Sequence, residues 1–94
     1  MGAKGDNALY EIRMLLGPTF GARDGLPAAV NKIAVACDVS PTSWMRAEQD
    51  INRVLGQFTL NVITGLRPYG LFLTMDHLWG YAPLPALEAT RRKR

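Results

Sequence analysis

The chain has 94 residues, which is enough for one small domain and too few for two. Apolar residues make up 48% of it, a fraction typical of a folded domain and too high for a disordered chain. The net charge is +3, but four of the 11 Lys and Arg residues are the last four, so residues 1–90 carry 7 positive and 8 negative side chains. Binding to nucleic acid would therefore depend on where a few cations are placed rather than on bulk charge.

Neither a membrane protein nor a disulfide-stabilised secreted protein is expected. No stretch approaches the run of about 20 apolar residues that a membrane span needs. Residues 1–8 begin no apolar segment of the kind that a secretory signal contains. Cys37 is the only cysteine, and one unpaired thiol suits a reducing compartment, so we expect a cytoplasmic protein.

The first predicted helix follows a short polar segment. Residues 1–7 have no apolar pattern and are expected to form a flexible arm. From Ala8 the sequence becomes helical, with Asn7 as the expected N-cap, and Gly17-Pro18 ends the helix. Three residues define the apolar face of this helix: Leu9, Ile12 and Leu16. Residues 17–25, with three Gly and one Pro, predict a loop.

Two further helices are predicted, separated by a short turn. Apolar residues recur at helical spacing between Val30 and Cys37, which predicts a helix over about 27–37. Ser40-Pro41 restarts the pattern, with an N-cap residue followed by Pro at the first helical position. This third helix is predicted to end at Gly56, and its apolar face contains Trp44, Ala47, Ile51 and Leu55.

After Gly56 the apolar residues alternate with polar ones, which is typical of a strand. Phe58, Leu60 and Val62 are separated by Thr59 and Asn61, and the apolar residues 71–75 predict a second strand. Residues 64–70 are rich in turn-forming residues and would join the strands, with Arg67 at the tip. The sequence therefore predicts a β-hairpin over 57–75. An alternative is that this hairpin is buried within another α+β fold.

Residues 30–47 resemble a helix-turn-helix motif. The turn has Asp38 where the motif usually has Gly, but Asp tolerates the left-handed conformation better than most residues. Small Ala34 would allow the two helices to cross closely. With the hairpin after it, the segment 8–75 resembles a winged helix-turn-helix domain. The implied fold is α+β, mainly α, with a three-helix core and a C-terminal β-hairpin wing. The positions that would be buried in the motif are Ile33, Cys37, Val39, Trp44 and Ala47.

This resemblance implies binding to double-stranded DNA, with the helix that starts after Ser40 entering the major groove. Arg46 would bind guanine and Gln49 adenine, while Thr42 and Ser43 could meet phosphates or bases. The remaining cations would contact phosphates, and Arg67 at the tip of the wing could reach either phosphate or a minor groove. The candidate DNA-binding residues are Lys32, Thr42, Ser43, Arg46, Gln49, Arg53, Arg67, Arg91, Arg92, Lys93 and Arg94.

Two carboxylates weigh against this interpretation. Glu48 and Asp50 stand beside the cations in the sequence, and Asp50 is four residues from Arg46, a spacing that allows pairing on a helix. The same helix could instead be a plain solvated surface. The basic tail, residues 91–94, could be a nonspecific phosphate anchor or a solubilising end.

The C-terminal segment 76–90 is expected to pack on the domain or to form a dimer, because one small module buries limited surface on DNA. Its candidate dimer residues are Trp79, Tyr81, Leu84 and Leu87. The alternative function is a winged helix that binds proteins. Such a module could act in a replication or transcription assembly, or as an inhibitor encoded by a mobile element.

We expect neither an enzyme nor a cofactor or metal site. The chain has no Gly-rich phosphate loop and no evident pair of acid and base residues. His77 is the only histidine, so no Cys/His cluster is available for a metal. No histidine is near Cys37 in the sequence to activate it as a nucleophile. The sequence therefore favours a small transcriptional regulator that binds duplex DNA, as a homodimer or with a protein partner.

Overall fold

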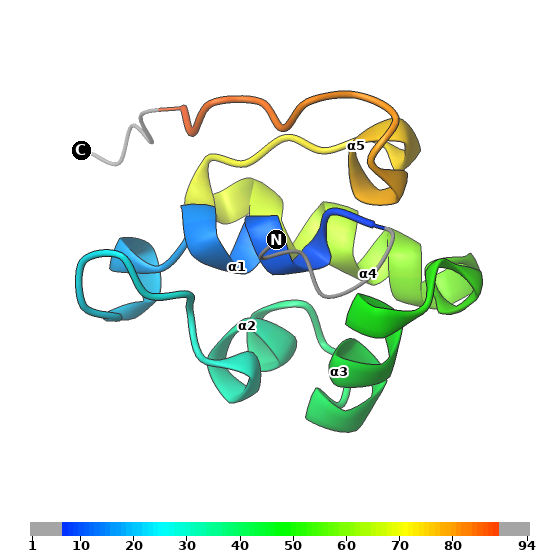
Figure 1. Cartoon of the computed structure of the whole chain (residues 1–94), viewed down its shortest axis with the longest axis horizontal. Helices are drawn as coiled ribbons and strands as arrows, with labels where there is room; N and C mark the ends of the chain where they lie inside the picture. The colour runs from blue at the N-terminus through cyan, green and yellow to red at the C-terminus, as the bar shows by residue number, and fades with distance from the viewer. Residues whose placement is uncertain (1–6, 89–94) are drawn as a thin grey trace.

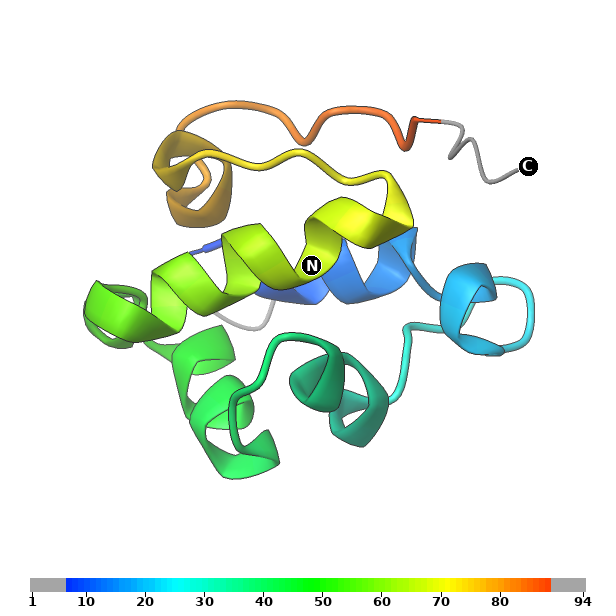
Figure 2. The same cartoon turned by 180° about the vertical axis from the view of Figure 1, so that it is seen from behind.

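A computed structural model describes residues 7–88, which fold into three layers of helices and extended segments (Figure 1). Helices α2 and α3 form one outer layer, α1 and α4 form the central layer, and α5 lies on the other side (Figures 1 and 2). The α-helices of the described residues are α1 (Leu9–Leu15), α2 (Val30–Ala36), α3 (Pro41–Gln49), α4 (Gly56–Leu66) and α5 (Met75–Trp79). Single turns of 3-10 helix are η1 (Pro18–Phe20), η2 (Ile51–Arg53) and η3 (Arg67–Tyr69).

The apolar face of α1 is buried as predicted. Leu9, Ile12 and Leu16 have no exposed surface, and the α-helix ends before Gly17. The predicted N-cap is one residue out of place, because Ala8 occupies that position and makes no side-chain cap. Asn7 instead accepts a hydrogen bond from the Leu9 N–H at 3.0 Å and donates one to the Ala47 carbonyl at 2.7 Å. It therefore links the start of α1 to α3.

Helices α2 and α3 form the predicted pair around a tight turn. α2 begins at Val30 rather than near residue 27, because Ala29 has an extended backbone. Asp38 adopts the left-handed conformation, with φ of 58°, and the Val39 N–H bonds the Ala34 carbonyl across the turn at 3.0 Å. Four of the five positions expected to be buried in the motif are buried, namely Ile33, Cys37, Trp44 and Ala47. The fifth, Val39, is partly buried against the core.

Helix α3 begins as predicted but ends earlier. The Ser40 hydroxyl accepts a hydrogen bond from the Ser43 N–H at 3.0 Å, and Pro41 occupies the first helical position. The prediction that this helix continues to Gly56 is wrong. Asp50 has an extended backbone, with φ of −150°, and its carboxylate caps the separate turn η2 through the Asn52 N–H. Leu55, expected on the apolar face, is largely exposed.

The predicted β-hairpin is wrong, because residues 56–66 form α4 and no strand occurs anywhere in residues 7–88. The buried residues of α4 recur at helical spacing and are Thr59, Val62, Ile63 and Leu66. Leu60, placed on the apolar face of the strand, is 55% exposed. Thr59 is a polar residue in the buried stripe, and Leu60 is an apolar residue outside it. These two residues produced the alternation that resembled a strand. Both the wing and the alternative buried hairpin are thus overturned, and the described fold is all-helical.

Gly65 brings α4 close to the end of α2. A Cβ atom at this position would lie 2.7 Å from the Ala36 carbonyl oxygen and 2.7 Å from the Cys37 Cα. Both neighbours are backbone atoms, which cannot move as a flexible side chain can. The predicted turn over 64–70 is therefore the end of a packed helix followed by η3, and Arg67 is not at the tip of a wing.

The rest of the described chain covers the other side of the central layer. Residues 71–74 are extended, with Leu71 and Leu73 buried and Phe72 exposed, so this alternation is real although it belongs to no sheet. α5 follows, and beyond it the chain returns beside residues 71–74 (Figures 1 and 2). The Glu88 N–H bonds the Gly70 carbonyl at 2.8 Å and fixes this return.

Candidate nucleic-acid interface

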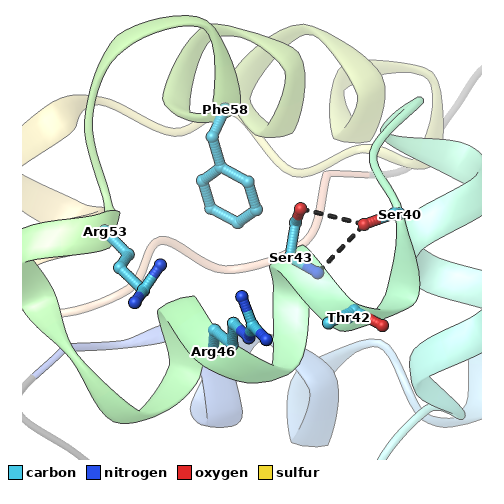
Figure 3. Close-up of a pocket in the computed structure, with 6 residues that line it drawn as sticks. All are labelled: Ser40, Thr42, Ser43, Arg46, Arg53 and Phe58. Carbon is cyan, nitrogen blue, oxygen red and sulfur yellow. Dashed lines mark hydrogen bonds between the residues drawn. The ribbon is translucent and has the colours of Figure 1, made fainter.

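A pocket opens between α3, η2 and the start of α4 (Figure 3). Its volume is about 210 Å³, and its lining residues are Ser40, Thr42, Ser43, Arg46, Arg53 and Phe58. The guanidinium groups of Arg46 and Arg53 and the ring of Phe58 point into the same space (Figure 3). The pocket therefore gathers two cations, hydroxyl groups and one aromatic wall.

The end of helix α3 at Asp50 explains how Arg53 reaches this pocket. In a continuous helix, Arg53 would lie about 10 Å further along the axis than Arg46, seven residues earlier. The extended backbone at Asp50 and the turn η2 bring the chain back toward α3 instead. Sequence periodicity placed both arginines on one side of a helix, whereas the structure places them around one pocket.

The hydroxyl groups at the start of α3 form a defined local network. Ser40 Oγ accepts from the Ser43 N–H and donates to Ser43 Oγ at 2.8 Å (Figure 3). Because Ser43 Oγ accepts this bond, its own proton remains free to be donated to a further acceptor. The pocket wall thus offers a hydroxyl donor beside the two guanidinium groups.

The charge in the pocket is mainly positive. Arg53 Nε lies 3.9 Å from Asp50 Oδ2, and the two side chains are 54% and 46% exposed. An ion pair this long and this exposed is weak. No carboxylate of residues 7–88 pairs with Arg46, so the pairing of Arg46 with Asp50 allowed by their spacing is wrong. Two cations therefore line this pocket, and the one carboxylate of the described residues in contact with either of them, that of Asp50, is not among the lining residues.

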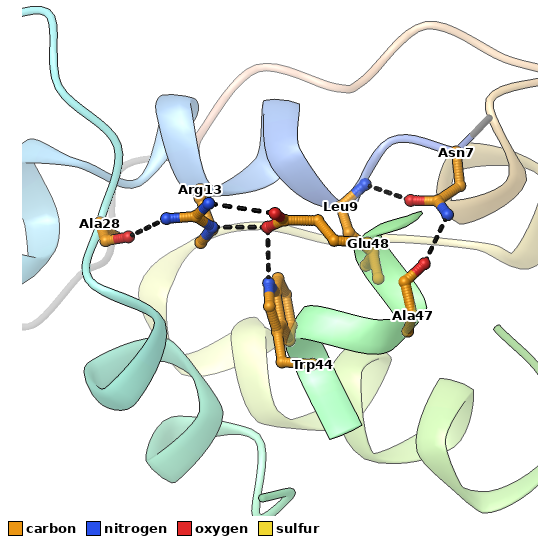
Figure 4. Close-up of polar contacts among 7 residues, drawn as sticks. All are labelled: Asn7, Leu9, Arg13, Ala28, Trp44, Ala47 and Glu48. Carbon is orange, nitrogen blue, oxygen red and sulfur yellow. Dashed lines mark hydrogen bonds and ion pairs between the residues drawn. The ribbon is translucent and has the colours of Figure 1, made fainter. Parts of the chain in front are cut away.

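Glu48 does not stand beside these cations, contrary to the sequence interpretation. Its carboxylate is buried on the side of α3 that faces α1 (Figure 4). Arg13 donates two hydrogen bonds to it, and Trp44 Nε1 donates a third at 2.9 Å. The charge of Glu48 is thus compensated internally, which removes one of the two objections to an anion at α3.

Four of the predicted DNA-binding residues line the pocket, namely Thr42, Ser43, Arg46 and Arg53. Three others do not. Lys32 Nζ bonds the Phe20 carbonyl at 3.2 Å, and Gln49 is exposed at the last position of α3. Arg67 follows the last residue of α4, an 11-residue helix about 16 Å long that has Phe58 near its other end. The remaining four, Arg91, Arg92, Lys93 and Arg94, lie outside the described residues.

Two residues of the pocket were not predicted as part of a site. Ser40 was assigned only a capping role, and Phe58 was assigned to a strand. The helical stripe of Thr59, Val62, Ile63 and Leu66 was the signal that would have placed Phe58 at the start of a helix. Its ring centroid lies 6.1 Å from that of Trp44, so the aromatic wall rests on the core.

The structure divides the four candidate dimer residues. Trp79 turns inward, where its Nε1 donates to the Val54 carbonyl at 2.7 Å, and Leu84 packs against the core. Tyr81 is 73% exposed, and Leu87 is also exposed. A second, more apolar pocket of about 230 Å³ lies beside Tyr81, and its lining residues are Ile51, Asn52, Val54, Leu55, Trp79 and Tyr81.

Cys37 is buried and pairs with no other cysteine in the described part of the chain. Burial raises the pKa of the Cys37 thiol to about 12, so the thiol is protonated at neutral pH and a poor nucleophile. No three His, Cys, Asp or Glu residues in this range are placed to hold a metal ion. The same residues include no helix with the length and hydropathy needed to cross a bilayer.

Comparison with protein-family models, with curated proteins and with solved structures finds no match for this chain.

Proposed function

We propose that this protein binds double-stranded DNA through the α2–α3 pair and acts as a small transcriptional regulator. One observation carries the proposal: Arg46 and Arg53 meet in one exposed pocket beside the start of α3, together with Thr42 and Ser43. Internal compensation of Glu48 supports it, because this carboxylate would otherwise repel phosphate. A wing has no part in the proposal.

The exposed side chains of α3 would divide the work of binding. Arginine and serine donors suit the anionic backbone, and contacts of this kind set the orientation of a protein on the duplex. Gln49, on the exposed side of α3 and outside the pocket, can bind the edge of adenine in the major groove. Occupation of a duplex site in this way is how the protein would control transcription.

The first experiment is fluorescence anisotropy of a labelled random duplex at two salt concentrations. The full chain is compared with a form that lacks residues 91–94. If the described residues bind DNA, both forms bind and both affinities fall steeply as salt rises. Binding by the full chain alone would show that the basic tail carries the interaction. It would favour the alternative, a module that binds proteins in a replication or transcription assembly or an inhibitor encoded by a mobile element.

A matched pair of variants then tests whether the exposed side of α3 contacts DNA. Arg46→Ala is expected to weaken binding to all duplexes and to lower the slope of log affinity against log salt by about 1, as loss of a phosphate contact does. Arg23→Ala removes an equally charged, exposed residue from the loop that follows η1 and is expected to change little. Equal effects of the two variants would contradict a role for α3.

The homodimer stays a prediction, because many helix-turn-helix proteins bind paired half-sites as dimers. Tyr81 and Leu87 are the two expected interface residues that the structure leaves exposed. Sedimentation of the wild type over a wide range of concentration measures the oligomeric state. Tyr81→Asp should shift any dimer toward monomer, and a monomer at all concentrations would remove the dimer from the proposal.

A further inference from the structure

We propose that the pocket between α3, η2 and α4 binds a single phosphate group of a nucleic-acid strand, which Arg46 and Arg53 hold jointly while Asp50 competes for Arg53. This inference rests on the proposed function and assigns a ligand to its central pocket. It also changes the role of Arg46, which the sequence alone had assigned to reading a guanine base.

The geometry of the two arginines carries the first step. Both guanidinium groups point into one space of about 210 Å³, from α3 on one side and η2 on the other (Figure 3). A guanidinium group presents a planar fork of N–H donors that matches the oxygens of a phosphate. Two such forks that converge on one space match a small anion with several oxygens better than the flat edge of a base.

The walls of the pocket support the same ligand. The Ser43 hydroxyl has a proton free to donate, since its oxygen accepts a hydrogen bond from Ser40. Phe58 closes the α4 side and is backed by Trp44, so one wall excludes water without competing for hydrogen bonds. A less hydrated wall strengthens the attraction between the guanidinium groups and an anion.

Asp50 is the internal competitor. Its Oδ2 lies 3.9 Å from Arg53 Nε, while its Oδ1 accepts the Asn52 N–H and holds η2 in place. The long, exposed contact with Arg53 is easily exchanged for a phosphate oxygen. The carboxylate therefore lowers the affinity of the pocket and leaves its shape intact.

The test uses the full chain and a labelled random duplex, with affinity measured by anisotropy across a range of salt concentrations. The variants are Arg46→Gln, Arg53→Gln and the double variant, with Arg23→Gln as the matched control. Each phosphate neutralised contributes about 0.9 to the slope of log affinity against log salt. If both arginines share one phosphate, the double variant loses about 0.9 in slope, whereas two separate phosphates would give about 1.8. A loss near the larger value, or no loss in a double variant that retains the wild-type circular dichroism, would overturn the proposal.

A variant that is expected to raise the affinity for duplex provides a second test, because a misfolded protein would lose affinity rather than gain it. Asp50→Asn keeps an N-cap residue for η2 but removes the competing charge. It is expected to raise duplex affinity several-fold in the wild type and to have no such effect when Arg53 is Gln. An equal gain in both backgrounds would contradict competition for Arg53 and indicate a general charge effect.

The source of the phosphate is settled by nuclear magnetic resonance of the arginine Nε–Hε groups. Duplex is expected to shift the Arg46 and Arg53 signals together, and inorganic phosphate to shift them only weakly, at high concentration. Saturation by inorganic phosphate at low concentration without a response to duplex would assign the pocket to a free phosphate and overturn the proposal.

If the wild type does not bind duplex at all, the proposed function fails. If the wild type and the double variant bind with equal affinity and salt slope, the pocket assignment alone fails.

Discussion

Arg13 on α1 and Glu48 on α3 form a buried ion pair joined at two points (Figure 4). Arg13 Nε lies 2.6 Å from Glu48 Oε2, and Nη2 lies 3.1 Å from Oε1. The two side chains are 12% and 6% exposed. The same guanidinium donates through Nη1 to the Ala28 carbonyl at 2.9 Å, just before α2. One side chain therefore fixes the position of the α2–α3 pair against α1.

Loss of one partner of this ion pair should be costly. Glu48→Ala leaves the Arg13 charge buried without its counterion and the Trp44 N–H without its acceptor. We expect the free energy of unfolding to fall by about 3–5 kcal/mol, measured by urea denaturation. Gln49→Ala, at the adjacent exposed position, should change it by less than about 0.5 kcal/mol. Similar effects of the two changes would show that the ion pair contributes little.

Gly65→Ala should destabilise the protein, although Ala favours helices by about 1 kcal/mol over Gly. The added Cβ would lie 2.7 Å from the backbone of Ala36 and of Cys37, so α4 and α2 must separate. We expect a loss of about 1–3 kcal/mol in thermal or urea unfolding. Leu60→Ala, on the exposed side of the same helix, is the control. A gain in stability at position 65 would contradict this close packing.

Asp38→Gly should stabilise the turn between α2 and α3. Asp38 has φ of 58°, a conformation that costs most L-residues roughly 1–2 kcal/mol. Glycine removes this cost but loses more entropy on folding, so we expect a net gain of about 0.5–1 kcal/mol. Asp38→Ala increases the steric cost, because Ala tolerates the left-handed conformation less well than Asp, and should lower the melting temperature. Differential scanning calorimetry checks both signs, and a lower melting temperature for the Gly variant would refute the prediction.

Cys37 should make stability depend on alkaline pH. Burial raises the pKa of its thiol from 9.0 to about 12, so the folded state keeps a proton that the unfolded chain releases near pH 9. Because the folded state binds more protons between pH 9 and pH 12, the stabilising contribution is complete below pH 9 and is lost as pH rises through this range. Denaturation of the wild type and Cys37→Ala isolates the effect from other titrating groups. The stability advantage of the wild type should shrink with pH, and a constant difference would contradict the shifted pKa.

Arg67→Ala should leave the affinity for duplex unchanged. Without a hairpin, Arg67 belongs to η3, which follows the C-terminal end of α4. Phe58 and the pocket lie at the N-terminal end of that helix. Arg53→Ala, with its guanidinium in the pocket, should weaken binding in the same anisotropy assay. An equal loss in the two variants would extend the DNA-binding face along α4.

Local signals explain which parts of the fold could be predicted from the sequence. The first helix, the Ser40 cap and the buried motif positions follow from spacing and backbone preference, whereas the sequence showed only that Asp38 tolerates the left-handed conformation that it adopts. The end of α3 was missed because no Gly or Pro marks it. The helix ends where Asp50 caps a new turn, η2. The fourth helix was missed because Thr59 is buried within its apolar stripe, where its hydroxyl has no partner among the described residues.

Long-range contacts explain the errors in the candidate site. Glu48 was expected near solvent because its partner, Arg13, is 35 residues away in the sequence. Gly65 was read as a turn residue, although its role depends on the backbone of α2. The arginines of α3 and η2 were found because helical spacing alone puts them on one side. Their convergence with Phe58 depends on the packing of α4, which periodicity at residues 58–62 had misassigned.

The contact between Phe58 and Trp44 gives the protein an optical probe of its own. Phe58 lines the pocket, and its ring centroid is 6.1 Å from that of Trp44, an indole with no exposed surface. Any ligand that displaces Phe58 changes the surroundings of this indole and hence its emission spectrum. In a Trp79→Phe background Trp44 is the single tryptophan, so with excitation selective for tryptophan the occupancy of the pocket can be followed in unlabelled protein.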